Sequence, residues 1–251
     1  WQKLTDLLGR TWAHESGQHL TIVRFAIDSG FETSAVYAWA RAVGFAQVAP
    51  VKGLEGFNRA SPVTGPTFVD ATIGGKRLRR GARLWSVATS TFKAESYRFL
   101  RQDRPTPEEI TVGASFPPGM VHLPIWADGE WLKQLTAEQL VTVKSRRGFS
   151  KLEWQKLRNE ALDCRVYARA AAWIAGADRW SDARWQEMER QLAVETEGSA
   201  TEVTAQLAPR RSRVGARCGR VTWGDHWLIA ATVVCRSGGS SGGRAGVRRD
   251  H

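Results

Sequence analysis

The stretch RNEALDCRVYA, residues 158–168, is the part of the chain from which its fold is best interpreted. As a helix, it places Glu160 and Asp163 three residues apart, so that both carboxylates lie on one face. Leu162 and Val166 fall on another stripe, and the alanines that follow permit close approach to a neighbouring layer. An acid on so tightly packed a helix lies near the core, where a buried carboxylate is costly unless something positive meets it.

A plainer interpretation of the same helix is structural. Charged residues most often occupy solvated faces, so Glu160 would stay in water and Asp163 would pair with Arg158 or Arg165. The rest of the chain is needed to choose between the two.

Length and composition narrow the class of protein. A chain of 251 residues can form one large domain or two small ones with a sizeable core, and its 12 tryptophans favour a packed globular core. No apolar run reaches the length that spans a bilayer. Three cysteines without paired metal-ligand spacing indicate a reduced, cytosolic protein. Because residue 1 is Trp rather than Met, we expect the sequence to begin partway into something longer.

The formal charge of +11 is spread unevenly along the chain. Nine arginines and two aspartates after residue 206 give the C-terminal end a large part of that excess. A basic chain suggests a polyanionic partner such as DNA. Residues 198–251 are dominated by Arg, Gly, Ser and Ala, apart from one apolar run at 227–234, and we predict this region to be mostly disordered.

A strand–helix–strand unit is predicted near the N-terminus. Residues 20–27 are apolar and β-branched and lead directly into Asp28, residues 33–43 have helical spacing, and residues 45–51 form a second strand that ends at Lys52. This order predicts a right-handed parallel crossover, with Asp28 and Lys52 at the same sheet edge. Open α/β sheets place ligand-binding groups at that edge. The alternative is an Asp that only serves a turn.

A basic loop follows between two further strands, which we predict at residues 67–73 and 82–89. The loop either contacts phosphates or is the solvated tip of a hairpin. Its basic residues are Lys76, Arg77, Arg79 and Arg80.

The remaining elements are predicted from periodicity and capping signals. They are helices at 1–17, 91–100, 137–144 (capped by Thr136) and 180–194, a short edge strand at 120–123 and a strand at 149–154. We interpret the lone His122 as structural.

Six pieces in the same order carry a resemblance to a known family. They are Ile27–Gly30, Lys52–Gly53, Thr91–Lys93, Pro118–Pro124, Gln134–Glu138 and Arg158–Ala168. Together they resemble the C-terminal nuclease domain of the phage terminase large subunit of the lambda GpA type. The resemblance implies an α/β, RNase H-like nuclease fold with a mixed sheet flanked by helices over residues 1–180. Spacing and composition, not the resemblance, predict a C-terminal helix at 181–197 and a largely disordered tail at 198–251.

The same resemblance implies metal-dependent endonucleolytic cleavage of concatemeric viral double-stranded DNA. In this family an N-terminal domain that binds ATP drives translocation, and no G-x-x-x-x-G-K-[ST] phosphate loop occurs in these residues. The implied partners are double-stranded DNA, a terminase small subunit and the portal of the procapsid, in the cytoplasm of a bacterial host, with no membrane.

The resemblance also implies a site. The family holds Mg²⁺ or Mn²⁺ with acids on two adjacent strands and on a late helix; Asp28 matches the second acid and Asp163 the third. Two such metals activate water and stabilise the leaving oxygen. Glu160 is a candidate outer metal ligand, and Lys52 and Lys93 are candidate phosphate contacts, with salt bridging as the alternative for these three.

Two departures from the family pattern bear on activity. The first acid lies on a strand that would precede Trp1, and relatives often carry an Asp near Ser90. We therefore expect this chain alone to cleave DNA poorly or not at all. The alternative is a catalytically inactive prophage remnant that at most binds nucleic acid through its Arg clusters. Another RNase H-like enzyme such as a transposase is disfavoured by the segments Pro118–Pro124 and Gln134–Glu138.

Overall fold

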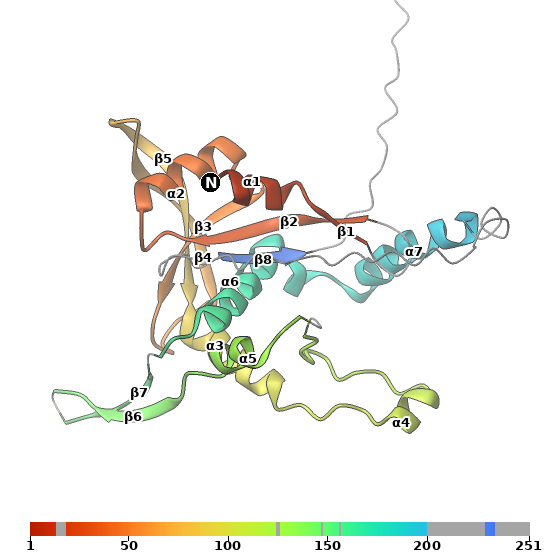
Figure 1. Cartoon of the computed structure of the whole chain (residues 1–251). Helices are drawn as coiled ribbons and strands as arrows, with labels where there is room; N and C mark the ends of the chain where they lie inside the picture. The colour runs from red at the N-terminus through yellow and green to blue at the C-terminus, as the bar shows by residue number, and fades with distance from the viewer. Residues whose placement is uncertain (14–18, 124–125, 147, 156, 200–228, 234–251) are drawn as a thin grey trace, which may run out of the picture.

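The chain folds around a mixed β-sheet with helices packed on both faces (Figure 1). The computed structural model describes residues 1–13, 19–123, 126–146, 148–155, 157–199 and 229–233, and the structural statements below concern these residues. None of the described helices combines the length and the apolar character that a membrane crossing requires.

Five strands give the sheet its main order, β1-β2-β3-β5-β4. The β2–β3 and β3–β5 pairs are parallel, whereas β1–β2 and β4–β5 are antiparallel. The strands are β1 Thr11–Ala13, β2 His19–Asp28, β3 Val48–Leu54, β4 Val63–Ile73 and β5 Lys76–Ala88. The sheet is mixed because a helix connects β2 to β3, while a two-glycine turn connects β4 to β5.

The parallel pairing of β2 and β3 is as predicted. Helix α2, Thr33–Val43, links the two strands and buries Val36, Trp39 and Ala40 against the sheet. Asp28 is in register with Val51, so β2 and β3 end at the same edge.

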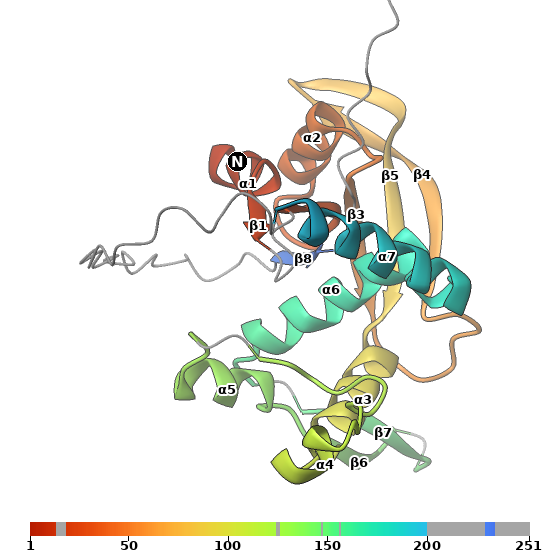
Figure 2. The same cartoon turned by 90° about the vertical axis from the view of Figure 1, so that its right-hand side faces the viewer.

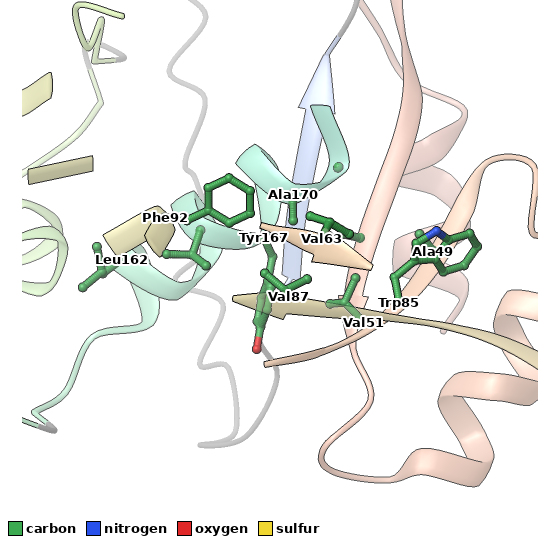
Figure 3. Packing of buried hydrophobic residues seen from close by; sticks show 12 residues of the cluster. Ala49, Val51, Val63, Trp85, Val87, Phe92, Leu162, Tyr167 and Ala170 are labelled. Carbon is green, nitrogen blue, oxygen red and sulfur yellow. The ribbon is translucent and has the colours of Figure 1, made fainter. Parts of the chain in front are cut away.

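Alternation along β2 supplies both faces of the sheet with core residues. Phe25 and Ile27 pack on the side of α1 (Gln2–Leu8) and α2, whereas Ala26 packs on the side of helix α6, Glu160–Ala175. Figure 3 shows the cluster on the α6 side, which includes Leu162 of α6 together with Phe92 and Val87. Leu162 is fully buried, and burial of such a side chain contributes about 1.5–3 kcal/mol.

Helix α6 is the helix predicted from residues 158–168. Leu162, Val166 and Ala170 are fully buried in one stripe, and Ala171 is also fully buried. Gly176 ends the helix in the left-handed region, at φ 94°. The first turn of α6 is what carries Asp163 to the sheet edge.

The other elements surround this core (Figure 2). They are α3 Thr89–Leu100, α4 Pro107–Thr111, α5 Gly129–Leu135, β6 Leu140–Lys144, β7 Ser150–Trp154, the 3-10 helix η1 Ala177–Arg179 and α7 Asp182–Ser199. Strands β6 and β7 form a separate two-stranded antiparallel sheet.

Three predicted elements are wrong. The helix predicted at 137–144 is strand β6 over most of its length, because the β-branched run Val141–Val143 favours a pleated ribbon paired with β7. The helix predicted at 1–17 ends at Leu8, before Gly9, and the chain continues as β1. No strand forms at 120–123 in the described part of the chain.

One part of the predicted disordered tail forms a strand. Strand β8, Ile229–Val233, pairs antiparallel with β2 along Ile22–Ile27. It falls in the apolar run 227–234, the one stretch of the tail with the apolar content of a strand. Helix α7 also extends to Ser199, past the predicted end near residue 194. The rest of the predicted tail lies outside the described residues.

Candidate active site at the carboxyl edge of the sheet

A cavity of ≈ 710 Å³ opens where the parallel strands β2, β3 and β5 end. Strands, helices and the β6–β7 hairpin all contribute to its wall. Its polar lining includes Asp28, Lys52, Glu55, Ser90, Lys93, Glu138, Asn159, Asp163 and Tyr167. The two acids that we predicted to converge, Asp28 and Asp163, therefore line the same cavity.

Asp28 is held at the last position of β2. Its carboxylate accepts hydrogen bonds from the backbone N–H group of Gly30 and from the hydroxyl of Tyr167. Burial nevertheless dominates and raises the pKa of Asp28, although these bonds and the nearby Lys52 oppose the shift. The site thus holds a carboxylate whose negative charge is incompletely compensated.

Tyr167 occupies the space between the strand ends and α6. Its hydroxyl is so close to β3 that a Cβ atom added at Gly53 would lie 2.8 Å from it. Burial, together with the charges of Asp28 and Asp163, raises the pKa of Tyr167 far above its usual value. The phenol therefore stays protonated and donates a hydrogen bond to Asp28.

Asp163 lies on the first turn of α6, across the cavity. Burial raises the pKa of Asp163, the charge of Lys93 lowers it, and the charge of Glu138 raises it further. The Lys93 Nζ atom is 3.6 Å from Asp163 Oδ1.

Glu138 is a site residue that the sequence interpretation did not select. Its side chain is 1% exposed, and Lys93 Nζ donates to both of its oxygens at 2.7 and 2.8 Å. Asn159 donates to Glu138 and also hydrogen-bonds to Asp163. The backbone N–H of Glu138 donates to the Tyr97 hydroxyl at 3.1 Å. In the sequence, Glu138 could have been selected because it ends the segment Gln134–Glu138, one of the six pieces of the family resemblance.

Two of the lysines predicted as phosphate contacts lie in the cavity wall. Lys93 is mostly buried and bound to Glu138, which corresponds to the salt-bridge alternative. Lys52 is exposed and lies near Asp28. Of the two, Lys52 is the one placed to meet a phosphate from solvent.

The structure does not bring the other predicted site residues into the cavity. Glu160 is paired with Arg158 at 3.2 Å and is absent from the cavity lining. The basic cluster Lys76, Arg77, Arg79, Arg80 starts at the opposite end of β5, which places it about 30–40 Å from the cavity at about 3.3 Å per residue. Arg77 pairs with Asp70 of β4 at 2.9 Å, so the cluster forms a hairpin tip.

No cage of three or more His, Cys, Asp or Glu side chains is present among the described residues. Mg²⁺ does not require one, because it usually keeps several waters and binds through one or two carboxylates plus phosphate oxygens. Asp28 and Asp163 fit that donor set.

Acids at the edge of an α/β sheet agree with the class of protein that sequence comparison identifies. The family model for the terminase large subunit gpA, endonuclease domain, matches residues 1–185, and the chain belongs to this family. The resemblance inferred from the six pieces is thereby confirmed.

Two terminase large subunits show what the chain is similar to. The protein of Escherichia phage lambda is 34% identical over 231 residues, which cover 89% of this chain and 30% of that protein. The protein of Enterobacteria phage P21 is 34% identical over 178 residues, which cover 69% of this chain and 25% of that protein. The chain thus spans less than a third of these relatives. No solved structure matches it.

The similarity to the lambda protein includes part of the C-terminal region. A match that covers 89% of the chain necessarily extends beyond residue 185. The Arg-rich composition after residue 198 therefore does not mark the end of the region shared with relatives.

Proposed function

We propose that this chain is the nuclease part of a phage DNA-packaging terminase large subunit, and that it hydrolyses phosphodiester bonds of concatemeric double-stranded viral DNA with divalent cations held by Asp28 and Asp163. The observation that carries the proposal is the shared cavity of these two acids, which come from β2 and from α6. A nuclease needs carboxylates that face a common, open space wide enough for a phosphate.

The electrostatics of the two acids suit a cation. Burial raises the pKa of both Asp28 and Asp163, so each negative charge is held at a cost that a bound Mg²⁺ or Mn²⁺ offsets. When bound, such cations supply an activated water and stabilise charge on the leaving oxygen.

The other side chains of the cavity position these acids. Tyr167 donates to Asp28 and fixes the direction of its carboxylate. Asn159 and Lys93 do the same for Asp163, while Glu138 holds both in place. Lys52, exposed beside Asp28, supplies a positive charge for the DNA phosphate.

Further features are proposed from the family resemblance. The sheet of parallel β2, β3 and β5, with acids at its edge and α6 across one face, supports an RNase H-like assignment. The terminase small subunit and the portal are the proposed partners, in the cytoplasm of the bacterial host. ATP hydrolysis is assigned to another domain of the intact protein.

One observation favours a second candidate, a catalytically inactive prophage remnant that at most binds nucleic acid. Ser90 lies buried in the cavity wall, where its hydroxyl oxygen accepts a hydrogen bond from Gly56 N–H at 3.0 Å. The family resemblance implies an Asp near this position. The cavity therefore has a hydroxyl where a further acid is expected.

Titration with Mn²⁺, followed by electron paramagnetic resonance, tests the proposal without requiring turnover. Asp28→Asn and Asp163→Asn are each expected to weaken Mn²⁺ binding at least tenfold. Glu160→Gln, a matched change on the same helix but outside the cavity, is expected to leave binding unchanged. Equal binding by all four proteins would contradict the metal assignment.

A further inference from the structure

The hairpin β6–β7 stands apart from the main sheet. Its strands pair from Leu140 with Trp154 to Lys144 with Ser150, and we call residues 140–154 the ribbon arm. In Figures 1 and 2 the arm projects from the body on the side opposite the β4–β5 turn. Its base lies at the candidate site, because Lys151–Trp154 form part of the cavity wall.

The base of the arm is fixed to helix α3. The ring of Trp154 stacks on Tyr97, with centroids 5.3 Å apart and an interplanar angle of 19°. The same Tyr97 accepts the backbone N–H of Glu138, which in turn holds Lys93 beside Asp163. The direction of the arm is therefore tied to the groups around the cavity.

The arm exposes an unusual surface for two strands. Phe149 is 73% exposed and Leu152 is 53% exposed. Lys144 and Arg146 are also exposed, and neither has an ion pair with a described residue. The arm sequence contains four basic residues and one acidic residue. An isolated two-stranded hairpin is at best marginally stable in water, so this exposed apolar and basic surface indicates a polyanionic partner.

We propose that the ribbon arm lies in the major groove of the substrate duplex, next to the bond that enters the cavity. The major groove, about 12 Å wide, admits a two-stranded β-ribbon, and the cations at the tip neutralise flanking phosphates. The inference rests on the proposed function only for the identity of the substrate as double-stranded DNA. According to this proposal the main DNA contact is made by the ribbon arm and not by the cluster Lys76–Arg80.

The length of the arm sets where it contacts DNA. Four residue steps of about 3.3 Å along β7, from Trp154 at the base of the arm to Ser150 near its tip, cover about 13 Å, and Lys151–Trp154 border the cavity along this length. At about 3.4 Å per base pair that is about four base pairs. The arm therefore holds the duplex within half a helical turn of the bond in the cavity.

The test uses the whole chain and a fluorescent 30-base-pair duplex in EDTA, with anisotropy measured over a range of salt concentrations. Lys144→Ala with Arg146→Ala is expected to weaken binding about 10- to 50-fold near 0.1 M salt and to reduce the slope of log K against log salt by about 2. Lys76→Ala with Arg79→Ala removes the same charge from the other hairpin tip, and its affinity is expected to stay within about twofold of the unaltered chain.

A second pair of variants adds a negative charge. Thr142 is an exposed residue of the arm, and Thr72 is a matched exposed residue of β4. The two variants are Thr142→Glu and Thr72→Glu. Only the first is expected to weaken binding, while both keep the thermal midpoint of the unaltered chain. Equal effects in the two hairpins, no effect of the arm variants, or tighter binding of single-stranded DNA than of duplex would overturn the inference.

This result is separable from the metal proposal. Binding in EDTA does not depend on divalent cations, so the effect of the arm variants can be measured whether or not Asp28 and Asp163 hold metal. If the arm variants bind the duplex as the unaltered chain does, while the Mn²⁺ titrations give the expected result, only the proposal for the ribbon arm is refuted.

Discussion

The hydroxyl of Tyr167 donates a hydrogen bond to the carboxylate of Asp28, joining helix α6 to the end of strand β2. Asp163 lies one turn earlier on the same helix and faces the same cavity. The two acids are therefore not independently placed. A shift of α6 along the sheet would move one acid directly and the other through the phenol.

This link predicts a coupling between Gly53 and Tyr167. In Gly53→Ala the new methyl group would lie 2.8 Å from the Tyr167 hydroxyl and 2.9 Å from Thr89 Cγ2, so we expect a loss of about 1–3 kcal/mol in unfolding free energy. Tyr167→Phe removes one of these clashes and is expected to recover part of the loss. Urea unfolding of both single variants and the double variant measures the coupling. Strict additivity would show that the contact carries no strain.

For the buried ion pair of Lys93 and Glu138, we predict that removing one partner lowers the free energy of unfolding more than removing both. Lys93→Met leaves a carboxylate that is 1% exposed without its cation, and we expect a cost of about 3–5 kcal/mol. Adding Glu138→Leu to Lys93→Met is expected to restore most of that stability, because a well-packed apolar pair can replace a buried ion pair. Denaturant midpoints at constant m-value provide the measurement. A double variant as unstable as the sum of the singles would contradict this account.

Asp163→Asn is predicted to stabilise the protein at neutral pH while removing the proposed metal ligand. Because burial raises the pKa of Asp163, the folded state binds the proton more tightly than the unfolded state. The contribution of this residue to stability therefore falls as pH rises from the ordinary Asp range through the raised pKa. The variant is expected to melt about 2–4 °C higher than the unaltered chain at pH 7 in EDTA.

The pH dependence provides the internal control for that prediction. The difference in melting temperature should vanish below about pH 4, where the carboxyl group is protonated in both states. Added Mg²⁺ should reduce the difference in melting temperature at pH 7, because it stabilises only the unaltered chain. A variant that melts lower at pH 7 would mean that attraction to Lys93 outweighs the burial of the charge.

Nicking of supercoiled plasmid in Mn²⁺ distinguishes the two candidate functions. We expect little cutting by the unaltered chain and a clear increase, about tenfold or more, in Ser90→Asp, whose new carboxylate would occupy the cavity wall and accept from Gly56 N–H. Ser90→Asn matches the size without the charge and should not increase cutting. Strong cutting by the unaltered chain, abolished by Asp163→Asn, would show that the acids already present suffice.

Sequence patterns anticipated the parts of the fold that follow from local rules. The apolar run before Asp28 and the helical spacing that follows it predicted the parallel β2–α2–β3 unit, and the spacing of Leu162 and Val166 predicted the buried face of α6. The ends of parallel strands share an edge, which predicted that Asp28 and Lys52 lie together, whereas the convergence of Asp28 with Asp163 of α6 was implied by the family resemblance. The metal role of these acids remains a prediction.

The features that escaped prediction depend on tertiary contacts. Glu138 follows a short helix and shows no local pattern; its importance lies in Lys93, 45 positions away, and in Asn159. Glu160 and Asp163 share one face of a helix, but only Asp163 lines the cavity, whereas Glu160 pairs with Arg158 at the helix start. The basic run 76–80 lies at the end of β5 away from the cavity, and charge alone could not reveal which end of β5 meets that cavity. Its contact with phosphate remains a prediction.

The pairing of Ile229–Val233 with β2 has a practical consequence for preparing this protein. A shortened version that stops at residue 185, where the family match ends, would strip one neighbour from Ile22–Ile27 and leave its backbone amides available to other molecules. Such a sample would be prone to aggregate, even though every residue matched to the family would still be present. The stretch that the family model matches and the stretch that keeps Ile22–Ile27 paired on this edge are thus different lengths of the same polypeptide.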